Sequence, residues 1–189
     1  MNDSKRIFDI FLCIIAGLLL IWPAFIVASV VRVTSEGPVI FWSDRVGRNN
    51  KIFLMAKFRT MRFGTPTVAT NDLQDPKSHL TSVGAFLRKT SLDELPQLWH
   101  IIRGEMSFVG PRPALFNQKE LIELRNAKGV QMLTPGLTGW AQVNGRDQLS
   151  IMEKVAFDVE YLDSKSTLLD MKILWLTLLR VVRFSGVSH

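Results

Sequence analysis

The sequence predicts an α+β, mostly α membrane protein, on three observations. A long uncharged apolar segment lies near the amino terminus, two β-prone runs follow it, and helical periodicities dominate the remainder. The length of 189 residues suits one domain, or one domain with an appendage. We therefore expect a membrane-anchoring helix at residues 1–33 and one further domain at residues 34–189, containing a β-hairpin and amphipathic interfacial helices.

The composition indicates a folded chain with more apolar residues than the core of a small soluble domain needs. Hydrophobic residues make up 47% of the sequence and charged residues 21%, which excludes a disordered or collagen-like protein. The lone cysteine, Cys13, excludes an intramolecular disulfide and gives no sign of an oxidising compartment. The net charge of +6 suits a membrane surface with anionic headgroups. Nucleic-acid binding, the usual alternative for a basic chain, is disfavoured by the lipid-grade segment.

The apolar segment, residues 10–31, carries no charge between Asp9 and Arg32. As one straight helix it would reach roughly 33 Å, enough to cross a hydrocarbon core of about 30 Å. Pro23 predicts a bend, and basic residues on both flanks favour keeping both ends on the cytoplasmic face. A re-entrant helix broken at Trp22 and Pro23, a kinked spanning helix and a buried hairpin in a soluble protein all remain open. A secretory signal fits less well, because no small-residue cleavage site follows.

The remaining elements follow from local patterns. Residues 39–42 and 52–58 are β-prone and flank a polar turn at 47–50, which predicts a hairpin, and residues 64–77 predict an exposed loop. Helical patterns cover residues 83–89, 93–102, 115–127, 151–163 and 167–184. The last helix is apolar except for a narrow polar stripe, so it lies either in the core or against lipid, and we favour the membrane surface.

Adjacent carboxylates, Asp93 and Glu94, are the leading candidates for chemistry. Pro96 is tolerated only in the first turn of a helix, so both carboxylates should stand at a helix amino terminus. Helix capping, by Ser91 or Asp93, with Glu94 complementing the dipole, explains them without any function. Alternatively, two neighbouring carboxylates can divide catalytic work, one attacking phosphorus while the other holds a divalent cation.

Basic residues offer candidate anion contacts. Arg112 stands between two prolines, where a rigid backbone would present its guanidinium to a phosphate or carboxylate, or to solvent. Lys57 and Arg59 should share one face of a strand. Alone, this pair is better interpreted as decoration of a solvated face than as an anion site.

Asp158 should project into the apolar face of the 151–163 helix, where a carboxylate needs a partner. Arg146 is one candidate, and a structural salt bridge is as good an explanation as a catalytic role. The three histidines show no metal-ligand spacing.

Several segments, taken together and in order, resemble one known family. They are KRIFD at 5–9, the Pro-broken apolar segment, KFRTM at 57–61, SLDELPQ at 91–97, MSFVGPRP at 106–113 and PGLTGWAQVNGR at 135–146. The order resembles the bacterial sugar transferase family, the monotopic polyprenyl-phosphate phosphoglycosyl transferases of the small PglC-like type. The resemblance covers nearly the whole chain and favours the re-entrant form of the anchor.

This resemblance implies an activity and a set of site residues. Members transfer a sugar-1-phosphate from a UDP-sugar to undecaprenyl phosphate and release UMP. The residue matching Asp93 becomes a covalent phosphosugar carrier, and the one matching Glu94 helps to bind Mg²⁺. Arg88 and Arg112 match arginines that contact phosphate or nucleotide. Arg59, which stands where close relatives can carry lysine, completes the family-matched set.

We add Arg146 and Asp158 as candidate substrate-binding residues. The resemblance further implies a catalytic domain, residues 34–189, on the cytoplasmic face of the bacterial inner membrane, acting at the first membrane step of glycan biosynthesis. Membrane lipids are then partners, and lipid-facing helices could supply a homodimer contact. A non-catalytic membrane scaffold for glycan enzymes is the alternative from another class, and a phosphohydrolase with water as acceptor is a third. Neither the sugar nor the glycan pathway can be read from the sequence.

Overall fold

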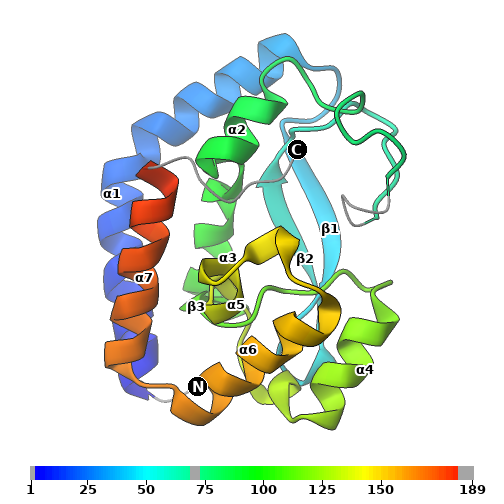
Figure 1. Cartoon of the computed structure of the whole chain (residues 1–189). Helices are drawn as coiled ribbons and strands as arrows, with labels where there is room; N and C mark the ends of the chain where they lie inside the picture. Colours follow the sequence, from blue (N-terminus) through cyan, green and yellow to red (C-terminus); the bar gives the residue numbers. More distant parts are fainter. Residues whose placement is uncertain (1–2, 69–72, 183–189) are drawn as a thin grey trace.

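The computed structural model describes residues 3–68 and 73–182, and it confirms a mostly helical α+β architecture with a long apolar amino-terminal helix and a β-hairpin (Figure 1). The helices are α1 (Asp3–Thr34), α2 (Gly84–Thr90), α3 (Leu98–Arg103), α4 (Lys119–Ala127), α5 (Trp140–Val143), α6 (Ile151–Ser164) and α7 (Thr167–Val182). The strands are β1 (Ile40–Val46), β2 (Ile52–Phe58), β3 (Ser107–Val109) and β4 (Gly136–Thr138). Short 3-10 helices include η1 (Arg48–Asn50) and η3 (Leu92–Gln97).

Helix α1 is a continuous helix that contains Pro23. Figure 1 shows the expected change of direction partway along it, but the expected break into two helices is not seen. A proline removes one backbone donor and displaces one turn, so the remaining hydrogen bonds can carry the helix through a bend. Within the described residues α1 is the helix long and apolar enough to cross a membrane, and only 11% of its most apolar window is buried.

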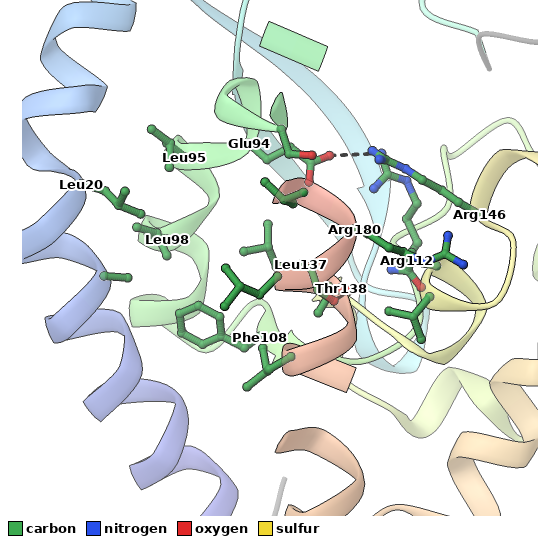
Figure 2. Close-up of a pocket in the computed structure, with 18 of the residues that line it drawn as sticks. Leu20, Glu94, Leu95, Leu98, Phe108, Arg112, Leu137, Thr138, Arg146 and Arg180 are labelled. Atoms are coloured by element: carbon green, nitrogen blue, oxygen red, sulfur yellow. Dashed lines mark hydrogen bonds and ion pairs between the residues drawn. The ribbon is translucent and has the colours of Figure 1, made fainter. Parts of the chain in front are cut away.

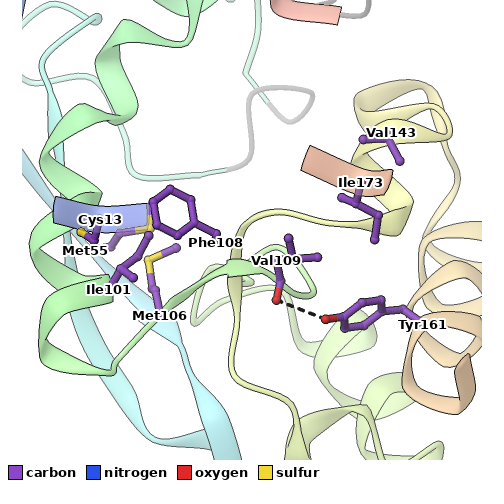
Figure 3. Close-up of a cluster of buried hydrophobic side chains, with 9 residues drawn as sticks. All are labelled: Cys13, Met55, Ile101, Met106, Phe108, Val109, Val143, Tyr161 and Ile173. Carbon is purple, nitrogen blue, oxygen red and sulfur yellow. Dashed lines mark hydrogen bonds between the residues drawn. The ribbon is translucent and has the colours of Figure 1, made fainter. Parts of the chain in front are cut away.

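The two halves of α1 pack on different parts of the protein. Cys13, in the first half, joins the main core, whose other members come from the hairpin, α3, β3, α5, α6 and α7 (Figure 3). Val27 and Val31, in the second half, pack against Phe58 of β2 and Leu87 of α2. Both halves of α1 therefore pack against other elements of the protein, while most of its apolar side chains are exposed.

The hairpin is confirmed, with β1 and β2 antiparallel and in register from Ile40 opposite Phe58 to Val46 opposite Ile52. A second sheet, the parallel pair β3 and β4, was not predicted. Strand β3 ends one residue before Gly110, and β4 lies within the 135–146 segment, where no regular structure was expected. Close backbone approach explains the glycines, because a Cβ on Gly136 would lie 2.1 Å from the backbone nitrogen of Gly110.

Other helix boundaries differ from the expected ones at their amino ends. The helix expected at 93–102 is divided into η3 and α3, and the one expected from residue 115 begins only at Lys119. Helix α6 matches its expectation closely. Helix α7 begins as expected, and the expected end at Phe184 lies outside the described residues.

Helix α7 turns its polar stripe inward. Asp170 is buried, and the hydroxyl of Thr177 lies 2.8 Å from that of Thr138 on β4. The large apolar side chains that α7 leaves exposed are Leu168, Met171, Trp175 and Leu178, and Lys172 is exposed among them. This is the inverse of a helix on a soluble protein, and such exposed apolar surface is typical of a membrane or partner contact. In Figure 1 α7 runs beside the first half of α1.

Candidate active site

Asp93 and Glu94 are placed by η3, the short helix that follows α2. The chain enters it through Ser91, which has a left-handed φ of 57° and makes no side-chain capping hydrogen bond. Both carboxylates are buried, at 5% and 8% exposure. The capping interpretation of Ser91 is therefore wrong, and two adjacent buried carboxylates require cationic partners.

Lys57 of β2 supplies the first of these cations. Its Nζ lies 2.6 Å from Glu94 Oε1 and 3.7 Å from Asp93 Oδ2. Arg112 donates from Nη2 to the same Glu94 oxygen at 3.2 Å. The interpretation of Lys57 as decoration is wrong, because the hairpin carries it over η3. The only signal in the sequence was its place in the KFRTM segment.

The two carboxylates have opposite electrostatic character. Burial raises the pKa of Asp93 above its ordinary value, and the neighbouring Glu94 charge raises it further, against the opposing charge of Lys57. Burial acts in the same direction on Glu94, but the charges of Lys57, Arg112 and Arg146 outweigh it and hold the pKa of Glu94 well below its ordinary value. Burial also lowers the pKa of Lys57. A pair with divided pKa values is what a division of catalytic roles requires.

Arg112 is held from behind by an ion pair. Arg125 of α4 donates from Nη2 to Asp158 Oδ2 at 2.7 Å and from Nη1 to the backbone carbonyl of Arg112 at 2.9 Å. The proposed pairing of Asp158 with Arg146 is wrong: α4 packs against α6 and brings Arg125 to Asp158 instead, a partner that the helix pattern alone did not indicate. Burial raises the pKa of Asp158 despite the Arg125 charge.

Of the other predicted site residues, Arg88 and Arg146 lie near the carboxylate pair, whereas Arg59 lies elsewhere. Arg88 of α2 is close enough for its charge to lower the pKa of Asp93, and Arg146 acts likewise on Glu94. Arg59 is buried elsewhere, donating to the backbone carbonyl of Glu36 at 2.9 Å, with its guanidinium 5.3 Å from the ring centre of Phe63. Arg59 has no contact with either carboxylate among those the structure gives.

An apolar cavity of about 380 Å³ opens beside Glu94. Figure 2 shows Glu94 with Arg112 and Arg146 at its polar end and leucines together with Phe108 around the rest. Ala16 and Leu20 of α1 form one wall and Leu174 and Leu178 of α7 another. The cavity therefore extends from a charged end near Glu94 to α1, the helix that is long and apolar enough to cross a membrane.

Metal binding at this site would depend on oxygen donors. Within residues 3–68 and 73–182 no group of three or more His, Cys, Asp or Glu side chains gathers as a metal site. Asp93 and Glu94 nevertheless fit Mg²⁺, which is usually held by one or two carboxylates together with substrate phosphates and water.

A buried carboxylate pair among cations, beside an apolar cavity, has the charges that phosphoryl-group chemistry requires and apolar surface that suits a lipid. Comparison with known proteins agrees: the Bacterial sugar transferase family matches residues 2–184, and the chain belongs to that family.

The chain is similar in sequence to proteins of about its own length and to part of longer ones. The uncharacterized sugar transferase EpsL of Bacillus subtilis (strain 168) is 39% identical, across 98% of this chain and 90% of its own. The exopolysaccharide production protein ExoY of Sinorhizobium fredii is also 39% identical, across 93% and 84%. The UDP-glucose:undecaprenyl-phosphate glucose-1-phosphate transferase of Escherichia coli (strain K12) is 42% identical, and the match covers 93% of this chain but 39% of that protein.

Proposed function

We propose that the protein transfers a sugar-1-phosphate from a UDP-sugar to undecaprenyl phosphate and releases UMP, at the first membrane step of bacterial glycan biosynthesis. The observation that carries the proposal is the position of the Asp93 and Glu94 pair among cations, with Glu94 lining the polar end of a cavity walled by α1. The name of the E. coli relative describes a UDP-glucose donor and an undecaprenyl-phosphate acceptor.

Asp93 is the nucleophile in the proposed first half-reaction. One carboxylate oxygen attacks the β-phosphorus of the donor, a new P–O bond forms, and the bond from that phosphorus to the bridging oxygen breaks. UMP leaves with the electron pair, and the sugar phosphate remains on Asp93 as a mixed anhydride. The positive charges around the site offset the repulsion between the carboxylate and the diphosphate. Lys57 contacts Oδ2 of Asp93 at 3.7 Å, and a carboxylate has lone pairs on both oxygens, so this contact leaves lone pairs for the attack.

Glu94 would hold Mg²⁺ together with phosphate oxygens of the donor. When bound, the metal neutralises charge on the diphosphate. The low pKa of Glu94 suits this role, since its carboxylate is ionised at any physiological pH.

The apolar cavity would receive the acceptor in the second half-reaction. A phosphate oxygen of the lipid attacks the same phosphorus, the bond to Asp93 breaks, and the carboxylate is regenerated. Leu20, Leu174 and Leu178 offer hydrocarbon contacts to the first isoprene units, while Arg112 and Arg146 offer charge to the phosphate.

We further propose that residues 1–33 form a re-entrant anchor and residues 34–189 a catalytic domain on the cytoplasmic face of the bacterial inner membrane. The bend in α1, the basic residues on both sides of it and the outward apolar face of α7 support this arrangement. Single cysteines at Ser4 and Lys77, in a Cys13→Ser background, should react with an impermeant reagent from the same side of sealed vesicles. Reaction from opposite sides would mean a spanning helix.

The activity is tested with the full chain in detergent micelles. A panel of UDP-sugars is mixed with undecaprenyl phosphate and Mg²⁺, and UMP and radiolabelled lipid are measured. We expect UMP and lipid product in equal amounts for at least one donor, and severe loss in Glu94→Gln. Sugar phosphate released into water without lipid would indicate a hydrolase instead. Full cellular function in Glu94→Gln would indicate a scaffold.

A further inference from the structure

Two cavities of different character meet at one wall. The second cavity, of about 170 Å³, shares Arg112, Gln142 and Arg146 with the apolar cavity. Its other lining cations are Arg45, Arg125 and Lys154, and none of its lining residues is acidic. The second cavity, hereafter the cationic cavity, therefore suits an anion, whereas the first suits hydrocarbon.

Gln142 is the neutral member of this wall, and its amide is unsatisfied. The residue is 8% exposed, yet neither Oε1 nor Nε2 has a hydrogen-bond partner among the described residues. An unpaired buried polar group costs about 1–3 kcal/mol, so native proteins rarely retain one without a use. Gln142 lines both cavities, so a ligand in either one would lie against the side chain that carries these unpaired amide atoms.

Gln142 stands on closely packed backbone. It lies on α5, the single turn that begins after Gly139, and a Cβ on Gly139 would lie 2.7 Å from Gln142 Oε1 and 2.1 Å from the carbonyl oxygen of Gly110. The approach to the Gly110 carbonyl requires glycine, because backbone cannot move aside as the end of a side chain can. The start of α5 therefore packs on Gly110, two residues before Arg112, whose guanidinium reaches Glu94 at 3.2 Å.

The chemistry of the amide indicates which part of a substrate it meets. It offers one donor group and one acceptor, both neutral, so it adds little to binding of a phosphate that three or more arginines already surround. The acceptor lipid consists of phosphate and hydrocarbon and carries no hydroxyl. The uridine of the donor also carries neutral hydroxyl and amide groups, but the α-phosphate separates them from the transferred phosphorus. The carbohydrate is the neutral, hydroxyl-bearing group bonded directly to the transferred phosphoryl group, and a primary amide can pair with it.

We propose that Gln142 hydrogen-bonds a hydroxyl or acetamido group of the donor's sugar and so helps to determine which UDP-sugar is used. The inference rests on the proposed function. The nucleotide then extends into the cationic cavity, and the hydrocarbon of the acceptor approaches from the other side of the wall. Residues of the wall serve both half-reactions, because the sugar phosphate stays in place while the nucleotide and lipid exchange.

The test compares Gln142→Met, which keeps the length and removes the hydrogen bonds, with Gln131→Met as a matched control. Gln131 is also a partly buried glutamine with an unpartnered Oε1, but it lines neither of the two cavities. For each full-length variant in detergent, kcat/KM is measured for UDP-glucose, UDP-galactose and UDP-N-acetylglucosamine, and for monodeoxy analogues of the preferred donor. Inhibition by UMP is measured in parallel.

We expect kcat/KM of Gln142→Met for the preferred donor to fall about 10- to 100-fold, and the ratio between donors to shrink by a similar factor. One deoxy analogue should be poor for the wild type and no poorer than the parent sugar for the variant. The UMP inhibition constant should change less than about twofold, and Gln131→Met should keep the wild-type donor ratios.

Other outcomes would overturn the proposal. If UMP inhibition and donor use weaken equally, Gln142 contacts the nucleotide. If the donor ratios and the deoxy pattern stay unchanged, the amide contacts no sugar. Should Gln142→Met not fold, Gln142→Asn is measured in the same way, and failure of both to fold would make the residue structural. Each of these results presupposes an active wild type, whereas a wild type that releases no UMP from any donor refutes the proposed function itself.

Discussion

Two buried ionic networks, each built around a lysine, differ in how completely they are satisfied. In the first, hereafter the anchor network, Lys5 of α1 and the hydroxyl of Tyr161 on α6 both contact Asp170 of α7, the hydroxyl at 2.7 Å. In the second, Lys57 stands between two carboxylates, Asp93 and Glu94. The anchor network gives one carboxylate two donors. In the second network Glu94 also has two cationic partners, Lys57 and Arg112, whereas the ion pair that the structure gives for Asp93 is the longer one, with Lys57 at 3.7 Å.

This difference suits the anchor network to holding helices together and the second network, around Lys57, to catalysis. The anchor network joins α1, α6 and α7, lines neither the apolar nor the cationic cavity, and burial together with Asp170 raises the pKa of Tyr161, which keeps the phenol neutral. The second network leaves Asp93 with a raised pKa and a loose contact beside a cavity. A network that is complete in itself stabilises the fold, and one that is incomplete is arranged for a ligand.

The largest effect on activity is expected from replacing Asp93, the proposed nucleophile. Asp93→Asn should lower turnover by at least about 10³-fold, because no covalent half-reaction remains. Mass spectrometry of wild-type enzyme mixed with its UDP-sugar, without lipid, should show a sugar phosphate adduct on Asp93, and the variant should show none. An adduct of normal yield on the variant would remove Asp93 from this role.

Breaking the anchor network should act on stability instead. Lys5→Met leaves Asp170 buried without its cation, and we expect the free energy of unfolding to fall by about 3 kcal/mol. Turnover per folded molecule should stay within about threefold of wild type. The exposed Lys119→Met is the control for thermal unfolding in detergent. A tenfold loss of turnover without loss of stability would show that the anchor network takes part in catalysis.

Lys57 and Arg59 provide a sharper comparison within one segment. Lys57→Met should lower kcat/KM about 100-fold, because two buried carboxylates lose their shared cation. Arg59→Met should lower it less than about fivefold, since its guanidinium contacts the carbonyl of Glu36 and the ring of Phe63. Steady-state kinetics on folded protein decides the matter. A larger effect for Arg59 would restore it as the substrate-binding residue predicted from the sequence.

The smallest effect concerns stability as a function of pH. The pKa of Asp93 in the folded protein lies above its ordinary value of 3.8, so its protonated form contributes stability that is present below that value and is lost as pH rises through the folded pKa. Asp93→Asn should therefore gain about 1 kcal/mol at pH 8 and little at pH 4.

Glu94→Gln should show the opposite sign. Its depressed pKa contributes stability above the ordinary value of 4.5, and this stability is lost as pH falls. The variant should therefore be less stable than wild type at pH 8 and approach it in acid. Thermal unfolding from pH 4 to pH 8 measures both trends. If the two variants change stability in the same direction at pH 8, the pKa values of Asp93 and Glu94 are not shifted in opposite directions.

Much of this molecule is specified locally. The uncharged run of α1, the two β-prone runs of the hairpin and the capping box that begins α6 at Ser150 each lie within a short stretch of sequence. The SLDELPQ and VGPRP segments marked Asp93, Glu94 and Arg112 as candidates, and the structure brings all three together. Such features can be predicted because neighbours in sequence provide the physical cause.

The remainder was decided by contacts between distant segments. Lys57 reaches η3 only because the hairpin packs there, and α4 rather than the 135–146 segment supplies the partner of Asp158. The parallel pair β3 and β4 forms where glycines let two backbones approach. By itself the sequence determined the anchor, the hairpin and the carboxylate pair, since periodicity and backbone restriction act over a few residues. Only the tertiary structure decided which cations neutralise the pair and which side chain is left unpaired at the wall, because charge and burial depend on distance in space.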